Sequence, residues 1–254
     1  MTIRERFHEP LSLDDMARSA MMSKYYFLRL FSRVTGVTPG RYLSAVRLHE
    51  AKRLLLTTSL NVADISAQVG YSSTGTFSRR FSESVGVSPT RYRQLECAQP
   101  VRDAEHHSRA DRPKAEKTAA ATSLTGTISA EEPPLSAVYL GLFDSAILQG
   151  RPVATTFATD EFRLDGVPPG TWYLHAVAHS AAESPDEPHT EPPLLVDVAG
   201  PLRFTAGGRV TVDLTIRPAD WTRPPILSAL PVVRGRLPMF GCATTCEPAV
   251  TGGA

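Results

Sequence analysis

The spacing of apolar residues changes along the chain, from a helical period to a strand period. Between residues 11 and 93 the apolar residues recur every three to four positions, whereas from about 123 to 218 they alternate with polar residues. The first spacing places apolar side chains on one face of a helix, and the second places them on one face of a strand. The sequence therefore predicts a multidomain protein, with an all-α domain followed by an all-β antiparallel sandwich.

The helical part contains an internal repeat. Seven of its residues return 50 positions later: Phe27, Arg29, Phe31, Gly36, Val37, Pro39 and Tyr42 recur as Phe77, Arg79, Phe81, Gly86, Val87, Pro89 and Tyr92. Upstream, Ser12 and Asp15 are matched by Asn61 and Asp64. Each of these pairs is typical of a helix start, because a Ser or Asn side chain accepts from a free first-turn amide and an acidic group favours the positive helix end.

Each copy of the repeat predicts two helices joined by a tight turn. The first helices span 13–20 and 62–69, and the second helices begin after Ser23 and Ser73 and stop near Gly36 and Gly86. This is the helix-turn-helix pattern. Between the copies, residues 39–56 predict one long helix with proline in its first turn. The alternative is a helical solenoid without a DNA role, but solenoids need at least three repeats and this chain has two.

The outward face of each second helix carries the candidate base-contacting residues. With Phe27 and Phe31 facing the core, a step of about 100° per residue turns Arg29 outward, and the repeat does the same for Arg79. An outward arginine can donate two hydrogen bonds to guanine in the major groove, although in isolation such a residue is more often just solvated. Tyr25 and Leu28 could meet thymine methyl groups or could cover a neighbouring helix.

Other polar residues of this domain are candidates for contacts with the phosphate backbone. Such contacts supply salt-dependent affinity and position the protein without distinguishing bases. The candidates are Ser23, Lys24, Arg33, Arg41, Arg47, Arg53, Ser73 and Arg91.

Charge divides along the chain in the same way as the apolar spacing. The overall formal charge is +1, yet residues 1–96 have 14 basic and 8 acidic side chains, and residues 123–254 have 8 basic and 14 acidic ones. A basic module joined to an acidic one is typical of a polyanion-binding domain with a partner domain.

Three stretches resemble the DNA-binding domain of AraC/XylS-type transcription regulators. They are RLHEAKRLL (47–55), VADISAQVGY (62–71) and FSRRF (77–81) followed by GVSPTRYR (86–93). The resemblance implies that both second helices enter successive major grooves on one side of the DNA, while the long helix fixes their separation. It implies two base-contacting sets, the first being Tyr25, Leu28 and Arg29 and the second Thr74, Gly75, Ser78 and Arg79.

The sequence departs from that family pattern in three respects. Met21 stands in the first turn where the family commonly has glycine, so the turn geometry is expected to differ, and Gly75 brings no side chain to a position that often contacts a base. AraC-type domains usually follow an effector-binding domain, whereas in this chain the motif begins near residue 1. We therefore expect any sensing to come from the residues that follow it.

Four regions are predicted. Residues 1–96 form the DNA-binding domain, 97–122 a flexible linker, 123–220 the β-sandwich, and 221–254 a proline-rich, irregular tail. Strands are expected at 136–143, 153–159, 171–179 and 209–217. Short strands separated by Gly and Pro turns, including the segment GVPPG at 166–170, resemble a carboxypeptidase-regulatory or prealbumin-like sandwich. That resemblance implies a binding or scaffolding module.

No residue pattern predicts catalysis, a metal or a cofactor. His175 and His179 share a strand face about 13 Å apart, too far for one ion, and the pair His106 and His107 fits a polar linker. Cys242 and Cys246 are too few for a structural zinc site, so ordinary tail cysteines are favoured over metal or redox sensing.

The sequence thus predicts a cytoplasmic, bacterial-type transcription regulator without enzymatic activity. No apolar run reaches membrane-span length. The expected partner is double-stranded promoter DNA, with RNA polymerase as a further candidate and an unknown ligand or protein for the sandwich. The alternatives are a DNA-tethered adaptor whose sandwich binds a protein or small molecule, and an enzyme with a DNA-binding accessory.

Overall fold

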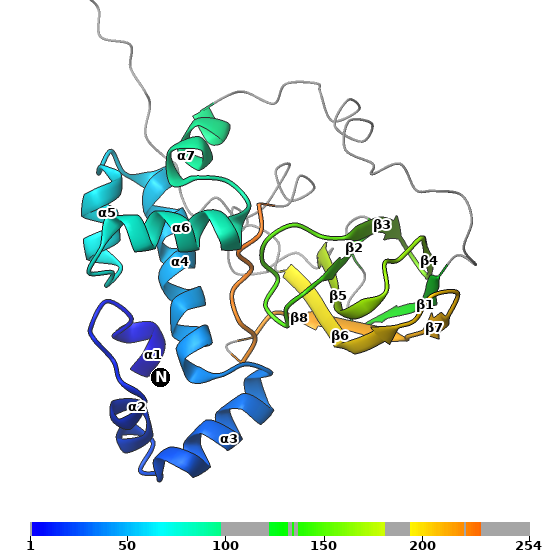
Figure 1. Ribbon diagram of the computed structural model, residues 1–254, viewed down its shortest axis with the longest axis horizontal. Helices are drawn as coiled ribbons and strands as arrows, with labels where there is room; N and C mark the ends of the chain where they lie inside the picture. The colour runs from blue at the N-terminus through cyan, green and yellow to red at the C-terminus, as the bar shows by residue number, and fades with distance from the viewer. Residues whose placement is uncertain are drawn as a thin grey trace, which may run out of the picture.

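The computed structural model describes residues 2–97, 122–131, 134, 137–180, 194–220 and 222–229, and within them a helical domain is followed by a β domain (Figure 1). The helices of this described part are α1 (Thr2–Glu5), α2 (Leu13–Ser19), α3 (Lys24–Thr35), α4 (Pro39–Thr57), α5 (Val62–Gln68), α6 (Thr74–Val85) and α7 (Pro89–Cys97). The predicted order of an all-α domain before an all-β domain is confirmed. No helix in the described ranges is long and apolar enough to cross a membrane.

The predicted helix starts are present as capping interactions. At α2 the Ser12 hydroxyl accepts from the amide of Asp15, and the Asp15 carboxylate accepts from the amide of Ser12. The Ser12 hydroxyl also donates to the Asp15 carboxylate at 2.6 Å, and this hydrogen bond, followed by the one from the Ser12 amide, lowers the pKa of Asp15. At α5 the Asn61 side chain accepts from the amide of Asp64 at 2.9 Å. Each cap satisfies amides that the first turn of a helix leaves without partners.

Equivalent aromatic contacts hold the two copies of the repeat together. The ring centroids of Phe31 and Tyr42 lie 5.4 Å apart, and those of Phe81 and Tyr92 lie 5.7 Å apart, both edge to face. All four side chains are buried. The recurring sequence anchors are therefore the core contacts that join each second helix to the helix after it.

The two helix-turn-helix turns have the same backbone conformation despite their different residues. Met21 has φ 53°, and Gly70, which follows α5 at the equivalent position, has φ 84°. Both lie in the left-handed region that favours glycine. The expected difference in turn geometry is therefore not seen at this torsion, because Met21 adopts the glycine conformation.

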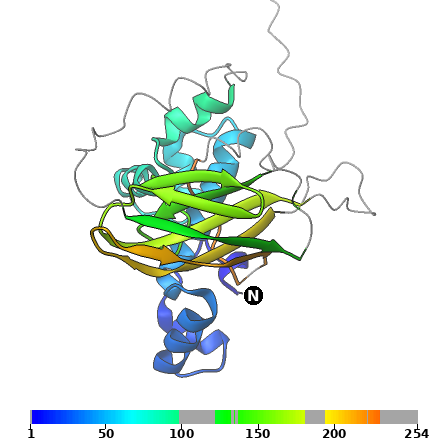
Figure 2. The same cartoon turned by 90° about the vertical axis from the view of Figure 1, so that its right-hand side faces the viewer.

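The β domain is one sheet that almost closes on itself (Figure 2). Its strands in the described ranges are β1 (Ser123–Ala130), β2 (Val138–Phe143), β3 (Ala154–Ala158), β4 (Glu161–Asp165), β5 (Gly170–His179), β6 (Leu194–Phe204), β7 (Arg209–Thr211) and β8 (Leu214–Pro218). They follow the order β3-β2-β5-β6-β8-β1-β4, and β7 pairs with β1. Most pairs are antiparallel, but β1 pairs in parallel with both β7 and β8.

The strand expected over residues 209–217 is two strands, because the chain leaves the regular ladder at Val212 and Asp213. The Val212 amide donates to the carbonyl of Thr125 at 3.0 Å, and the Asp213 carboxylate accepts from the Thr127 hydroxyl at 2.7 Å. A Cβ atom on Gly126 would lie 1.7 Å from the Val212 carbonyl oxygen, so only glycine fits on β1 at this crossing.

Candidate nucleic-acid interface

The two second helices, α3 and α6, lie towards opposite ends of α4 (Figures 1 and 2). Each buries a pair of phenylalanines at four-residue spacing, Phe27 with Phe31 and Phe77 with Phe81. Each also ends at a left-handed glycine, as the sequence predicts. The repeat therefore builds two equivalent helices, each with one face committed to the core and the other free to meet a ligand.

Both predicted base-contacting arginines are exposed. Arg29 lies on the outer face of α3, and Arg79 occupies the equivalent position on α6. Arg79 has one ion pair, with Glu83 one turn later at 3.4 Å, and both side chains of that pair are more than half exposed. Such a surface pair contributes at most about 1 kcal/mol. The guanidinium can therefore exchange Glu83 for a ligand at little cost.

The remaining candidates for base contact differ between the two helices. On α3, Tyr25 is 83% exposed and Leu28 is half-buried. On α6, Thr74 and Gly75 are exposed in the first turn and Ser78 is half-buried. The α3 face is thus the more apolar and bulkier, and the α6 face is small and polar.

Sequence reasoning missed one large exposed residue beside this surface. Met21 is 95% exposed in the turn that precedes α3, four positions before Tyr25. Its position in a turn, where the helical spacing is interrupted, hid its exposure.

Three of the candidate phosphate-contacting residues lie at the starts of the second helices, and two more are exposed cations nearby. The hydroxyls of Ser23 and Ser73 cap α3 and α6 by accepting from the amides of Tyr26 and Thr76, both at 3.4 Å. Lys24 pairs with Asp14 at 2.7 Å, which raises the pKa of the lysine. Arg33, on the last turn of α3, is exposed, as is Arg91 on the first turn of α7.

Three other arginines in that group have partners within the protein. Arg47 donates to the carbonyl oxygens of Phe7 at 2.7 Å and Glu9 at 2.8 Å, and burial lowers its pKa. Arg53 pairs with Glu50 one turn before it. Arg41 donates to the hydroxyl of Ser145 in the β domain at 2.7 Å. A phosphate contact by Arg41 or Arg47 would replace these internal hydrogen bonds.

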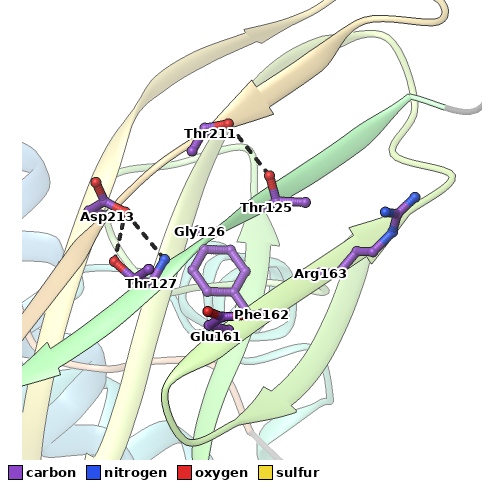
Figure 3. A pocket seen from close by; sticks show the side chains of 8 residues that line it. All are labelled: Thr125, Gly126, Thr127, Glu161, Phe162, Arg163, Thr211 and Asp213. Carbon is purple, nitrogen blue, oxygen red and sulfur yellow. Dashed lines mark hydrogen bonds between the residues drawn. The ribbon is translucent and has the colours of Figure 1, made fainter.

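The β domain has a shallow groove of about 490 Å³ beside the crossing of β1 and β7 (Figure 3). Its lining residues are Thr125, Gly126, Thr127, Glu161, Phe162, Arg163, Thr211 and Asp213. Several of their polar groups already bond to one another: Asp213 accepts from Thr127, and the hydroxyls of Thr125 and Thr211 lie 3.5 Å apart. The groove therefore offers few free groups to a ligand.

The histidines on β5 are separate from that groove. Nε2 of buried His175 lies 2.8 Å from the carbonyl oxygen of Ser145, and burial lowers its pKa to about 4. The ring nitrogens of His179 are buried and have no hydrogen-bond partner among the described residues. Within the described part of the chain no three His, Cys, Asp or Glu side chains gather as a metal site. His106, His107, Cys242 and Cys246 lie outside the described residues.

Known proteins match the helical domain. A family model described as a helix-turn-helix domain matches residues 16–95. The transposon Tn10 TetD protein of Escherichia coli is 38% identical over 92 residues, which are 36% of this chain and 67% of that protein. The HTH-type transcriptional activator AarP of Providencia stuartii is 37% identical over 83 residues, 33% of this chain and 62% of AarP.

One similar solved structure is a transcriptional regulator with an AraC-type DNA-binding domain from Chromobacterium violaceum. It is 32% identical, the match covers 39% of this chain and 88% of that chain, and the TM-score is 0.37. Across curated relatives, the matched segment spans from about a third to two thirds of the relative's length. The family match ends at residue 95, before the β domain begins.

The fold and the two outward helix faces define a double helix-turn-helix protein. With the match over residues 16–95, the chain belongs to the AraC-type helix-turn-helix family.

Proposed function

We propose that this protein is a sequence-specific DNA-binding transcription regulator. In this proposal α3 and α6 enter successive major grooves of double-stranded DNA, at an asymmetric site of roughly 20 base pairs with its two contacts about one helical turn apart. The observation that carries the proposal is the equivalence of Arg29 and Arg79, two exposed arginines on equivalent faces of two helices linked through α4. AarP, a similar protein, is named a transcriptional activator.

We assign base contact to the outer faces of the two helices. The set on α3 is Tyr25, Leu28 and Arg29, and the set on α6 is Thr74, Gly75, Ser78 and Arg79. The exposed or half-buried state of every member supports the assignment. Because Gly75 contributes no side chain, the α6 contact depends most on Arg79, which can donate two hydrogen bonds to guanine.

We assign phosphate contact first to Lys24, Arg33 and Arg91, which are exposed cations close to the two helices. Ser23 and Ser73 are secondary candidates because their hydroxyls lie at the positive ends of α3 and α6. Arg41, Arg47 and Arg53 rank below these, since each guanidinium has an internal partner.

The site of action in this proposal is the cytoplasm, and RNA polymerase is a candidate partner on the promoter. A DNA-tethered adaptor is less well supported than a regulator. In the adaptor alternative the β domain binds a protein or small molecule while the helical domain tethers it to DNA; the relative named a transcriptional activator favours the regulator.

Two arginine variants test the proposal, with a fluorescently labelled duplex selected by the full-length protein from a random library. Arg79→Ala should weaken binding to the best site by about 1–3 kcal/mol and relax preference at one base position. Arg91→Ala should weaken all sequences alike and reduce the salt slope by about 1. Identical behaviour of the two variants on matched and mismatched duplexes would contradict the assignment of roles.

A further inference from the structure

Two segments that follow the helical domain in the chain lie against it. One is residues 144–150, in the connection between β2 and β3. The other is residues 222–229, which run beside α4 on the side that faces the β domain (Figure 1). Ile147 from the first segment and Leu227 from the second are 3% and 1% exposed, and both belong to the apolar core of the helical domain. Two residues from the β side therefore complete a core that the helices begin.

The second segment packs on both domains. Ile226 contacts an apolar cluster on the β domain that includes Tyr139, Phe143 and Val177, whereas its neighbour Leu227 joins the helical core. The amide of Leu227 donates to the carbonyl of Leu148 at 2.9 Å, which ties the two segments together. Residues 222–229 therefore form a layer between the domains.

The last turn of α6 accepts one hydrogen bond from each of the two segments. The amide of Gly150 donates to the carbonyl of Ser84 at 2.6 Å, and the amide of Ala229 donates to the carbonyl of Val85 at 3.0 Å. The final carbonyl groups of a helix have no partner within the helix. The two segments thus cap the C-terminal end of α6.

A buried lysine of α4 forms hydrogen bonds with the second segment. Lys52 is 7% exposed, and its ammonium donates to the carbonyl oxygens of Ile226 at 3.3 Å and Leu227 at 3.1 Å. It also lies 5.7 Å from the centre of the Tyr92 ring. Burying an ammonium is costly unless fixed partners replace its water, and these carbonyls are such partners.

A further contact reaches the first turn of α4, close to the end of α3. The Arg41 guanidinium donates to the Ser145 hydroxyl, and the backbone of Ser145 is held by His175 from inside the β domain. The contacts therefore extend along α4 from its first turn to Lys52 and on to the end of α6. They touch α4, which follows the first helix-turn-helix unit, and α6 of the second unit.

We propose that residues 144–150 and 222–229 act as an intramolecular splint. With α4, they fix the separation of α3 and α6 and the angle between these two helices. The inference rests on the proposed function, because it assigns the β domain a part in choosing the spacing between two contacted DNA segments. In this proposal the faces of α4 and α6 that contact the two segments serve for docking within the protein.

The test compares three duplexes: the sequence selected by the full-length protein, and two derivatives with one base pair inserted or deleted between its two contacted segments. The wild-type protein should discriminate strongly against both derivatives. Leu227→Ala should reduce this discrimination by about fivefold or more, a typical size for coupling between sites. Lys52→Met should act in the same direction while keeping most of the apolar volume.

Leu164→Ala is the matched control, because Leu164 is 4% exposed but lies in the separate core of the β domain. This variant should lower the stability of the β domain and leave the discrimination between duplexes unchanged. Equal discrimination by wild type, Leu227→Ala and Lys52→Met would overturn the splint.

Amide hydrogen exchange of the protein without DNA tests the splint independently of the proposed function. In the wild-type full chain, the amides of Gly150 and Ala229 should exchange at least about a hundredfold more slowly than in an unstructured peptide, and Leu227→Ala should remove this protection. Unprotected amides in the wild type would refute the splint even if DNA binding were specific. Protected amides together with no sequence preference would refute the proposed function and leave the docking intact.

Discussion

The two helix-turn-helix turns offer a paired test of backbone strain. Met21 and Gly70 hold equivalent left-handed positions, but their surroundings differ. Met21 is 95% exposed, so its side chain gains little from packing. A Cβ atom on Gly70 would lie 2.7 Å from the carbonyl oxygen of His8 and 3.0 Å from a guanidinium nitrogen of Arg47. Replacing Met21 by glycine should therefore raise the stability of the domain, whereas replacing Gly70 by alanine should lower it.

The magnitudes follow from these surroundings. A left-handed torsion costs a non-glycine residue about 1–2 kcal/mol, and glycine loses about 0.5–1 kcal/mol of extra chain entropy on folding. Met21→Gly should therefore stabilise the domain by about 0.5–1 kcal/mol. Gly70→Ala gains the entropy but meets the torsion strain and about 1–3 kcal/mol of overpacking against a backbone atom. We expect a net destabilisation of about 2 kcal/mol.

Urea unfolding of the full chain, followed by the helical circular dichroism signal, measures both changes. Met21→Ala is the control, because it removes the side chain and keeps the strain, and it should change the free energy of unfolding by less than about 0.5 kcal/mol. The strain explanation is refuted if Gly70→Ala is no more destabilising than Met21→Ala, or if Met21→Gly lowers stability.

Three further predictions concern the β domain and its contacts. Because the pKa of buried His175 is lowered to about 4, the unfolded state binds the extra proton first as pH falls below 6.5, and this residue should lower stability by about 3 kcal/mol towards pH 4; His175→Gln should remove that part of the fall, while His49, whose pKa burial also lowers to about 4, should keep its own part. Gly126→Ala should destabilise the β domain by more than about 3 kcal/mol in thermal unfolding, since its Cβ would collide with the Val212 carbonyl, and a neutral result would show that the strands can separate there. Arg41→Ala should speed the exchange of the Gly150 amide, and Ser145→Ala should speed it more, because the Ser145 hydroxyl also accepts from the Ile147 amide and the Gln149 side chain; an effect of Arg41→Ala on DNA affinity alone would favour a phosphate contact instead.

The helical domain could be predicted from the sequence because its anchors recur. The two Phe pairs, the glycines after α3 and α6, and the tyrosines in the helices that follow occupy the same places in both copies. Local spacing and capping residues were therefore enough to place α2 to α6 to within a few residues, whereas α1 and α7 were not predicted. The exposed faces followed from the buried ones by helical geometry.

The contacts between the domains could not be predicted in this way. Helical spacing places Lys52 on the buried face of α4 and Arg53 off it, but a lysine there needs polar partners, and the carbonyl groups that supply them are more than 170 residues away in the chain. Leu227 stands in a proline-rich stretch without periodicity, and its burial depends on residues far away in the chain. The parallel pairing of β1 with β8 joins segments more than 80 residues apart, which alternation along one strand cannot reveal.

Arg41 shows how tertiary contacts change the meaning of a residue. From sequence it is one of several outward cations in a basic domain and predicts a phosphate contact. In the folded chain its guanidinium lies 2.7 Å from a serine hydroxyl of the β domain. The residue type is the same in both interpretations, and only the position of the partner distinguishes them.

The proposed function depends above all on two equivalent helices contacting two separate DNA segments. Selection of bound duplexes from a random library by the full-length protein, repeated with Arg29→Ala and with Arg79→Ala, examines this directly. We expect two groups of preferred bases about one helical turn apart, with each variant losing preference within one group only. A single group, no preference, or loss of both groups in either variant would contradict the two-helix interface.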